Sequence, residues 1–293
     1  MDATWLEHCL TEAELDRFDR AGYLVIEDAL PPALLERAIV AVDRLDHEQR
    51  QAGLAPHALL SLTDFIRLDP VFLDLMDCAR VFPKIWGVLG WNIYVYHAHL
   101  DVTPPADEQR RVAQRDYRAW HQDSMRVNDE IESHPRPRLS LKVAYFLTDT
   151  SVPDCGAMHV WPGSMEQDEL HLAPGEYDPP GTIALTVKPG TAVLFDRRLW
   201  HSRSLNTAQV TRKGVFFGYS YRWLQPKDDM NVKELYERID PIRRQLLGGR
   251  TSADGLYAPL PEDVPLRTFL EKHGRLSSAR DYHRGAAAGK APR

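Results

Sequence analysis

Residues 92–224 form a series of short segments rich in β-branched and aromatic residues, and this series constrains the fold more than any other feature. Segments with a period of two residues predict strands. We place strands at residues 93–102, 118–124, 138–149, 157–163, 182–190, 192–204 and 213–224. Turn sequences such as VPDCG, DPPG and KPGT separate them, and no helical pattern intervenes. Strands joined without crossover helices are antiparallel, so we expect a sandwich or barrel.

Helical patterns precede this strand series. Thr11 and Glu14 have the spacing of a capping box, which opens a short helix that Gly22 ends. The strand sequence YLVIEDAL follows. Residues 31–51 begin with proline and repeat apolar residues every three or four positions, which predicts an amphipathic helix. Another helical stretch is expected over residues 70–87.

Helical patterns return after the last strand, at NVKELYERIDPIRRQLLG and PLRTFLEKHG. We therefore expect a single domain over residues 1–293 that is mainly β with flanking helices. Its parts are a mostly helical segment over 1–90, a β core over 91–225, helices over 226–283 and a disordered tail over 284–293. The sequence contains no internal repeat, no G-x-G-x-x-G and no P-loop.

The composition excludes several classes of protein. With 293 residues and 43% hydrophobic content, the chain can bury a sizeable core. A net charge of −6 lacks the basic footprint of a nucleic-acid-binding protein. No apolar run approaches the roughly 18 residues of a membrane span, and no signal peptide is recognisable. Three widely spaced cysteines favour a reducing cytoplasm, so we expect a cytoplasmic protein that binds small molecules.

The segment RAWHQDS places His121 two residues before Asp123. Residues two apart on a strand point to the same face, so both side chains could reach one ion. A histidine from another strand would complete a set of two histidines and one carboxylate, which leaves coordination positions open and suits non-haem iron(II). His201, at the end of a hydrophobic strand, is the candidate third ligand. The alternative is a polar pair with a structural role.

Arg212 follows His201 by eleven residues and opens an aromatic strand. A buried guanidinium needs an anionic partner, and a bidentate carboxylate is the usual one. A dicarboxylate co-substrate that chelates iron at one end and meets Arg212 at the other would supply this partner.

In their order, these residues resemble the phytanoyl-CoA dioxygenase family of Fe(II)/2-oxoglutarate-dependent oxygenases. The resemblance comprises H-x-D, the distal histidine in HSRSLN and the arginine eleven residues later. The opening FDRAGYLVIEDAL and the segment YFLTDTSVPDCGAMHVWPGSM also resemble the family. The likeness extends from about Phe18 to about Trp223, which is most of the chain.

The resemblance implies a double-stranded β-helix, or jelly roll, with a cupin-like core, in agreement with the strand pattern. It implies that His121, Asp123 and His201 bind iron(II), and that Arg212 binds the C5 carboxylate of 2-oxoglutarate. The co-substrates would be 2-oxoglutarate and O₂, with ascorbate as the reductant in vitro. Family members that halogenate lack the carboxylate ligand, so Asp123 argues against halogenation.

The family also implies an outcome, which is oxidation of an unactivated C–H of a small organic molecule, hydroxylation by default. Desaturation, cyclisation or epimerisation would use the same iron site. Basic residues for the phosphates of coenzyme A are not concentrated in the chain, so we favour a secondary metabolite or its precursor as substrate. A non-catalytic jelly-roll binding protein is a further alternative.

Departures from the family pattern concern the secondary contacts to 2-oxoglutarate. Many relatives carry serine two residues after the distal histidine, but Arg203 stands here, between Ser202 and Ser204. We take Ser204 as the candidate cofactor contact. The PGSH sequence common in relatives is PGSM in this chain, with Met165.

Other polar residues on the expected strands could also line the site. His97 and His99 share one strand face, and we take His97 as a candidate cofactor contact. With His159 they could instead form an all-histidine, cupin-type metal site without 2-oxoglutarate, but Arg212 would then lack a partner. A polar pair on a half-exposed strand is the third possibility. Lys142 either extends into the pocket as a cofactor contact or snorkels outward.

Two tryptophans and two loops complete the expectations. Trp120 and Trp200 precede candidate ligands and should face the opposite side of their strands, toward the core. The loop over residues 103–117 is either a lid or a solvated surface loop. The loop over residues 125–137 is close to the ligands and is the candidate determinant of substrate specificity.

Overall fold

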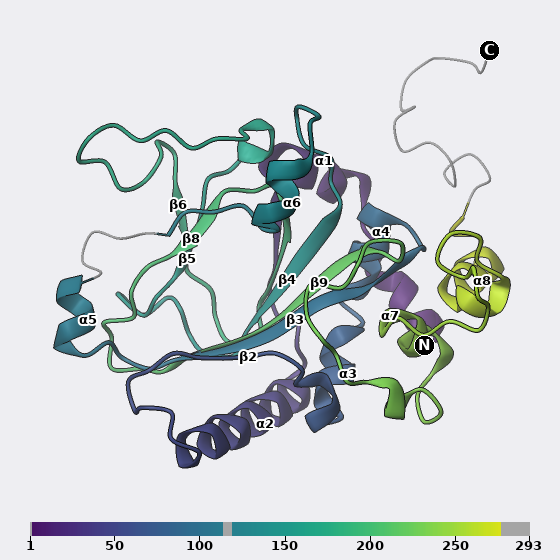
Figure 1. Cartoon of the computed structure of the whole chain (residues 1–293), viewed down its shortest axis with the longest axis horizontal. Helices are drawn as coiled ribbons and strands as arrows, with labels where there is room; N and C mark the ends of the chain where they lie inside the picture. The colour runs from purple at the N-terminus through teal and green to yellow at the C-terminus, as the bar shows by residue number, and fades with distance from the viewer. Residues whose placement is uncertain (1, 114–118, 277–293) are drawn as a thin grey trace.

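The computed structural model describes residues 2–113 and 119–276 (Figure 1). Its centre consists of two antiparallel sheets. The larger has the strand order β1-β7-β4-β9-β3-β2, and the smaller has the order β6-β5-β8. The strands are β1 (Tyr23–Ile26), β2 (Leu60–Leu62), β3 (Ile93–Thr103), β4 (Ser140–Phe146), β5 (Met158–Val160), β6 (Ile183–Leu185), β7 (Ala192–Asp196), β8 (His201–Arg203) and β9 (Arg212–Tyr221). This arrangement confirms the expected mainly β jelly-roll fold.

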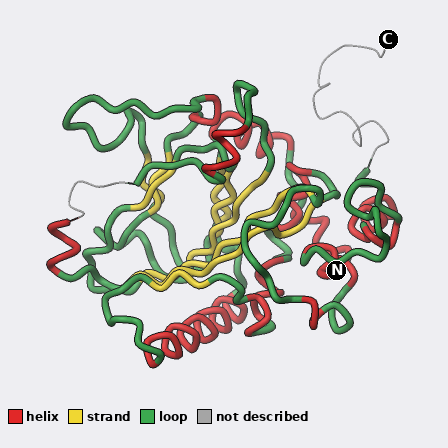
Figure 2. Tube along the Cα trace, in the orientation of Figure 1, coloured by secondary structure: helices red, strands yellow, loops and turns green. Residues whose placement is uncertain are grey.

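Helices surround the sheets, and Figure 2 shows them gathered outside the strands, chiefly along the larger sheet. The α-helices are α1 (Glu12–Ala21), α2 (Pro32–Gln51), α3 (Val71–Met76), α4 (Phe82–Leu89), α5 (Glu108–Ala113), α6 (Met125–Glu130), α7 (Pro241–Leu246) and α8 (Pro265–Lys272). The short 3₁₀ helices are η1 (Ala3–His8), η2 (Ile66–Leu68), η3 (Ser164–Glu166), η4 (Lys233–Leu235) and η5 (Pro261–Asp263). None of the helices in the described part of the chain has the length and hydrophobicity needed to cross a membrane.

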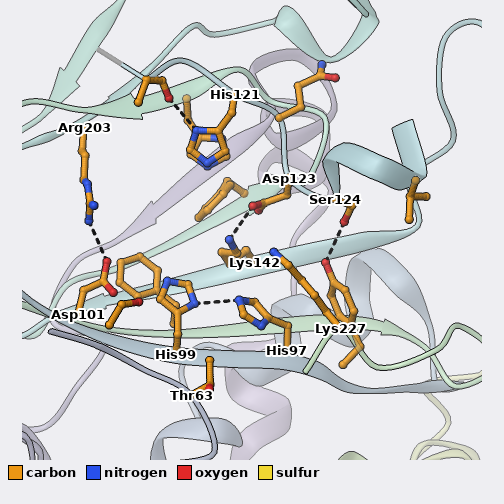
Figure 3. Close-up of a pocket in the computed structure, with 18 of the residues that line it drawn as sticks. Thr63, His97, His99, Asp101, His121, Asp123, Ser124, Lys142, Arg203 and Lys227 are labelled. Carbon is orange, nitrogen blue, oxygen red and sulfur yellow. Dashed lines mark hydrogen bonds and ion pairs between the residues drawn. The ribbon is translucent and has the colours of Figure 1, made fainter. Parts of the chain in front are cut away.

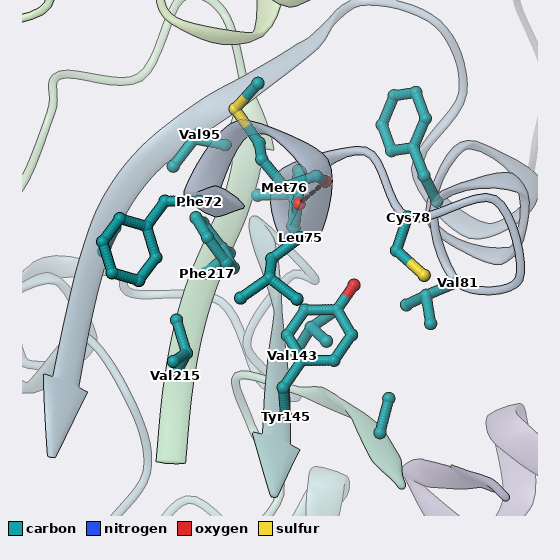
Figure 4. Close-up of a cluster of buried hydrophobic side chains, with 14 of the residues drawn as sticks. Phe72, Leu75, Met76, Cys78, Val81, Val95, Val143, Tyr145, Val215 and Phe217 are labelled. Atoms are coloured by element: carbon teal, nitrogen blue, oxygen red, sulfur yellow. Dashed lines mark hydrogen bonds between the residues drawn. The ribbon is translucent and has the colours of Figure 1, made fainter. Parts of the chain in front are cut away.

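The two faces of strand β4 show how the larger sheet separates the core from the site. Leu141, Val143 and Tyr145 point toward the helices and join the main hydrophobic core. Figure 4 shows Val143 and Tyr145 among side chains from α3 and strands β3 and β9. Ala144 and Phe146 point the other way and pack against the smaller sheet. Because successive side chains alternate on a strand, one face of β4 builds the core and the other is available for function.

The N-terminal elements follow the sequence pattern closely. Thr11 and Glu14 form the expected capping box, in which each side chain bonds the other residue's backbone N–H. Gly22 ends α1 with a left-handed φ of 82°. Strand β1 then pairs with β7, so the segment after α1 is part of the larger sheet. The helix expected over residues 70–87 is instead two helices, α3 and α4, and the short strand β2 was not predicted.

The predicted strand over residues 118–124 is wrong for the residues that the structure describes. His121 makes one isolated antiparallel bridge with His201, and α6 begins directly after Ser124. Ala119 and Ser124 have left-handed φ values of 48° and 66°, which interrupt an extended strand.

Three other predicted segments also differ from the structure. The strand predicted over 192–204 divides into β7 and β8. The loop predicted over 103–117 contains α5, and the loop predicted over 125–137 begins with α6. Residues 114–118 and the predicted tail over 284–293 lie outside the described residues.

Candidate active site

A cavity of about 780 Å³ lies where the inner face of the larger sheet meets the smaller sheet. Strands β3, β4, β7 and β9 supply one side of its wall, and β5 and β8 supply another. The segment from Ala119 to Val127 and the segment from Leu224 to Lys227 complete the lining. Figure 3 shows the polar side chains of these elements converging on the same space. The volume lies within the range of small-molecule sites in proteins.

His121 and His201 are held together by their main chains. The backbone N–H of each donates to the carbonyl oxygen of the other at 3.0 Å, and their ring centroids lie 4.2 Å apart. The Nδ1 atoms of both rings contact backbone carbonyls at 2.9 Å, those of Ala119 and Leu199. When Nδ1–H donates to a carbonyl, Nε2 keeps its lone pair for a metal.

Asp123 is fixed at its backbone and at one carboxylate oxygen. Its N–H donates to the carbonyl of Arg197 at 2.9 Å, and its own carbonyl accepts from the Asn128 amide at 3.1 Å. Oδ1 accepts a hydrogen bond from Lys142 Nζ at 2.7 Å. Oδ2 is buried and has no hydrogen-bond partner among the described residues. An unpaired buried carboxylate oxygen is a donor atom available to a cation.

These three residues bring potential metal-binding atoms together. One atom from each of His121, Asp123 and His201 lies within 4.8 Å of the others. No other group of three His, Cys, Asp or Glu residues in the described part of the chain meets this criterion. Two imidazoles and one carboxylate suit a non-haem iron(II) ion with open coordination positions.

The electrostatic surroundings keep both types of candidate ligand, imidazole and carboxylate, in the protonation state that binds a metal. Burial, with a smaller contribution from His121, lowers the pKa of His201 to about 3, so this imidazole is neutral at neutral pH. Burial alone would raise the pKa of Asp123, but the ammonium of Lys142, with smaller contributions from His201 and His121, outweighs burial and lowers that pKa. A neutral imidazole and an ionised carboxylate are the forms that coordinate metals.

Arg212 supplies a buried positive charge at another part of the cavity wall. Its side chain is 4% exposed, and its Nε atom has no hydrogen-bond partner among the described residues. Burial lowers the pKa of Arg212 to about 10, so the guanidinium stays protonated at neutral pH. The nearby Asp101 is already paired with Arg203, at 3.0 Å. A buried guanidinium with an unused donor fits an anionic ligand.

Of the two serines near the distal histidine, the cavity is lined by Ser202 and not by Ser204. The hydroxyl of Ser202 is buried and has no hydrogen-bond partner among the described residues. Ser204 lines a separate pocket of about 330 Å³, and its hydroxyl lies 3.4 Å from the carbonyl of Ala157. The position of Ser204 therefore does not support the cofactor contact expected for it.

The histidines of β3 form a chain with an aspartate. His97 Nε2 lies 3.0 Å from His99 Nδ1, and His97 Nδ1 lies 3.2 Å from Asp228 Oδ2. The His99 ring stacks on Phe216, with the ring centroids 4.5 Å apart. Both histidines line the cavity, whereas His159 does not. The geometry does not bring these three histidines together as an all-histidine metal site.

Trp120 and Trp200 do not pack into the core, so that prediction was wrong. Both are half-buried, and their indole N–H groups donate to backbone carbonyls. Trp120 donates to the carbonyl of Tyr177 at 3.0 Å, and Trp200 donates to the carbonyl of Gln167. The two tryptophans therefore attach the segment before β6 to the residues that flank the candidate ligands.

The sequence did not predict that the segment after β9 forms part of the cavity wall. Lys227, in the segment after β9, extends over the cavity beside Lys142 (Figure 3). Ser124 lines the same region and contacts the hydroxyl of Tyr96 at 3.2 Å. A lysine in a loop after the last strand resembles any solvated lysine, so only its place in the fold reveals it.

The comparison with known families identifies the chain. The model of the family described as phytanoyl-CoA dioxygenase matches residues 18–214, more than half of the sequence. The chain belongs to the phytanoyl-CoA dioxygenase family. It is a dioxygenase that depends on iron and 2-oxoglutarate.

Individual proteins agree with membership in the phytanoyl-CoA dioxygenase family. The ectoine dioxygenase of Sphingopyxis alaskensis is 26% identical over 234 residues, which cover 69% of this chain and 73% of the relative. Dioxygenase trt7 of Aspergillus terreus is 31% identical over 245 residues, covering 78% and 81%. The crystal structure of HygX from Streptomyces hygroscopicus with nickel and 2-oxoglutarate bound has a TM-score of 0.59 at 17% identity, and covers 78% of this chain and 94% of that one.

Proposed function

We propose that this dioxygenase binds iron(II) through His121, Asp123 and His201, binds 2-oxoglutarate through Arg212, and oxidises an unactivated C–H of a small organic molecule. The proposal rests mainly on one observation, the three ligand atoms within 4.8 Å of one another in the cavity wall. Hydroxylation is the default outcome. Desaturation, cyclisation and epimerisation would need the same site with another substrate placement.

Two unpaired polar atoms support the fit of these groups. Asp123 Oδ2 and Arg212 Nε are both buried without a hydrogen-bond partner among the described residues. Burying such atoms unpaired is unfavourable, and a metal cation at the first and a carboxylate at the second would remove both deficits. Bound iron(II) and 2-oxoglutarate would supply the activation of O₂, with 2-oxoglutarate converted to succinate and CO₂.

The protein's own contribution is positioning. The bridge between His121 and His201 fixes two imidazoles, and Arg212 orients the far carboxylate of the co-substrate. Phe195 and Phe216 provide apolar wall next to these groups and limit the access of water. Catalytic groups that are held before the substrate arrives need little reorganisation during the reaction.

The cavity walls favour a small substrate with an apolar body and polar substituents. Apolar lining comes from Val127, Met158, Leu224 and other side chains, while Ser61 and Thr63 add hydroxyl groups. The volume of about 780 Å³ has to accept 2-oxoglutarate as well as the substrate. We therefore propose a secondary metabolite or its precursor rather than an acyl-coenzyme A thioester.

The domain organisation and the location in the cell are parts of the same proposal. Residues from Phe18 to Leu270 contribute to one hydrophobic core, which supports a single catalytic domain. The three cysteines are free thiols, as a reducing cytoplasm would keep them.

Succinate release from 2-oxoglutarate, measured with iron(II) and ascorbate, tests the proposal. We expect turnover by the wild type, none by His121→Ala, and by Arg212→Ala only at about 100-fold higher 2-oxoglutarate, the scale of a lost charge-assisted pair. His171→Ala is the matched control, because this exposed histidine lies outside the cavity. Unchanged turnover in His121→Ala, or no binding of 2-oxoglutarate by any variant, would contradict the proposal.

A further inference from the structure

Lys142 makes a buried ion pair with Asp123. The Nζ and Oδ1 atoms are 2.7 Å apart, and the two side chains are only 9% and 5% exposed. Lys142 stands in the middle of β4, whose backbone pairs with β7 on one side and β9 on the other. Among the described residues, Asp123 is the only carboxylate at ion-pair distance from Lys142. The central strand of the sheet thus directs one cation at one oxygen of a candidate ligand, as Figure 3 shows.

We propose that Lys142 is a positioning residue that occupies Asp123 Oδ1 and leaves Oδ2 as the single oxygen for the metal. This inference rests on the proposed function of the site. A carboxylate can bind a metal through one oxygen or through both. Binding through both would use a further coordination position, one that the 2-oxo acid and O₂ need. A charge-assisted hydrogen bond to Oδ1 keeps that position open.

The backbone of Asp123 does not depend on this lysine. Its N–H and carbonyl are held by Arg197 and Asn128, so the loop keeps its place when the Lys142 side chain is shortened or made neutral. Lys142 instead restricts the rotation of the Asp123 carboxylate group. Substitution of Lys142 should therefore change how the carboxylate binds the metal without displacing the ligand.

The charges around Asp123 predict that removal of Lys142 has opposite effects on the affinity for the metal and the affinity for 2-oxoglutarate. Before metal binding, Lys142 is the ion-pair partner of the buried Asp123 carboxylate, and no second ion pair of Asp123 is found among the described residues. With the metal in place, two cations share one carboxylate and repel each other. Removing the lysine should thus strengthen metal binding. The freed carboxylate can then take a second position on the metal, which should weaken the binding of 2-oxoglutarate.

Lys227 provides a matched control. It lines the same cavity as Lys142, and no ion pair of Lys227 is found in the described part of the chain. Lys227→Met removes the same kind of charge from the same cavity but leaves the hydrogen bond between Lys142 and Asp123 in place. A general loss of positive charge would change binding in the same way in both variants, whereas loss of the carboxylate contact would produce the opposite changes only in Lys142→Met.

Anaerobic titrations of the full-length protein test the inference. Cobalt(II) binding is followed by calorimetry and by the visible bands of the ion, and 2-oxoglutarate binding by its charge-transfer band with iron(II). We expect Lys142→Met to bind cobalt about tenfold more tightly and 2-oxoglutarate about tenfold more weakly, the scale on which groups behind a metal ligand act. Lys142→Arg, which keeps a cation at Oδ1, should stay near the wild type, and Lys227→Met should not change the two affinities in opposite directions.

The other possible results of these titrations would contradict either the inference about Lys142 or the proposed function. If Lys142→Met binds cobalt equally or more weakly, or keeps its affinity for 2-oxoglutarate, the inference is wrong. If Lys142→Met does not fold, Lys142→Met/Asp123→Asn should restore the fold, because the uncompensated charge is then removed. Failure of that double variant to fold also overturns the inference. Absence of metal binding by the wild type would instead contradict the proposed function.

Discussion

His121 and His201 exchange backbone hydrogen bonds, each N–H donating to the carbonyl of the other at 3.0 Å. This single bridge joins two residues that are far apart in the sequence and carries both candidate imidazole ligands. Each ring is then turned by a contact between its Nδ1 and a carbonyl two residues earlier. The spacing of the two imidazoles is therefore constrained by the main chain.

Removal of the metal should leave the fold intact. Treatment with a chelator is expected to abolish turnover while the circular dichroism spectrum stays unchanged, and iron(II) should restore activity. A metal at 100 times its Kd should add about 2.7 kcal/mol to the free energy of unfolding. Thermal unfolding with and without cobalt(II) measures this gain. Loss of secondary structure on chelation would show that the site is not preformed.

Arg212→Lys should separate charge from geometry at the co-substrate site. Lysine keeps the positive charge but cannot form the two parallel hydrogen bonds of a guanidinium. We expect the KM for 2-oxoglutarate to rise by about tenfold with little change in kcat, less than in Arg212→Ala. Steady-state kinetics at saturating O₂ provide the values. Equal KM values for Arg212→Lys and Arg212→Ala would mean that charge contributes nothing here.

Asp196 should contribute stability that depends on pH. Its fully buried carboxylate accepts hydrogen bonds from Arg138 at 2.6 Å and Arg198 at 2.8 Å. Burial alone would raise the pKa of Asp196, but these two guanidinium groups outweigh it and lower that pKa. We expect Asp196→Asn to lower the free energy of unfolding by about 3 kcal/mol at neutral pH, as for other broken buried pairs.

The sign of the pH effect follows from this lowered pKa. The contribution of Asp196 is present above the ordinary aspartate pKa of about 3.9, and it is lost as the pH falls further toward the folded-state pKa. Urea unfolding of the wild type and Asp196→Asn should thus converge as the pH decreases below about 4. The exposed Asp254→Asn is the control and should differ little from the wild type at any pH. A difference for Asp196→Asn that does not vary with pH would contradict the assignment.

Gly22→Ala should destabilise the protein through a close contact as well as through backbone strain. Gly22 has a φ of 82°, and a Cβ there would overlap Met165 Sδ and lie 3.0 Å from Leu199 Cδ1. Gly53 has a φ of 108° and open space around it, so Gly53→Ala reports the strain alone. Chemical unfolding should give Gly22→Ala an additional loss of about 1–3 kcal/mol, the usual range for overpacking. Equal losses of unfolding free energy in the two variants would mean that the side chains of Met165 and Leu199 move aside at no energetic cost.

The strand pattern and the family resemblance were sufficient to predict the jelly-roll fold and to select three residues whose potential ligand atoms the structure brings together. The alternation of inward and outward side chains along β4 and β9, and turn sequences such as KPGT, depend on neighbouring residues alone and can be recognised in the sequence. The predicted strand through His121 was wrong because its ends are set by left-handed residues, Ala119 and Ser124, that are not glycines. Non-glycine residues take up this conformation only when their surroundings impose it, so the sequence has no signal for it.

Contacts between segments that are distant in the sequence were the second feature that sequence analysis could not predict. The core positions predicted for Trp120 and Trp200 failed because their indole N–H groups find carbonyls in the segment before β6. The choice between Ser202 and Ser204 depended on where β8 ends, since both serines would share one strand face. Lys142 was expected at the cavity or outside it, but its partner Asp123 emerged only from three-dimensional contacts.

The cavity is lined by residues that carry the candidate ligands and, separately, by a segment that carries none of them. The candidate ligands belong to the bridge between His121 and His201 and to the adjoining Asp123, whereas residues from Leu224 to Lys227 belong to a segment beyond the last strand. Exchange of that segment would alter the space available to a substrate while every ligand contact stayed in place. Selection for a new substrate could therefore act on a few exposed positions, and a library built over residues 224–227 would reproduce that route in the laboratory.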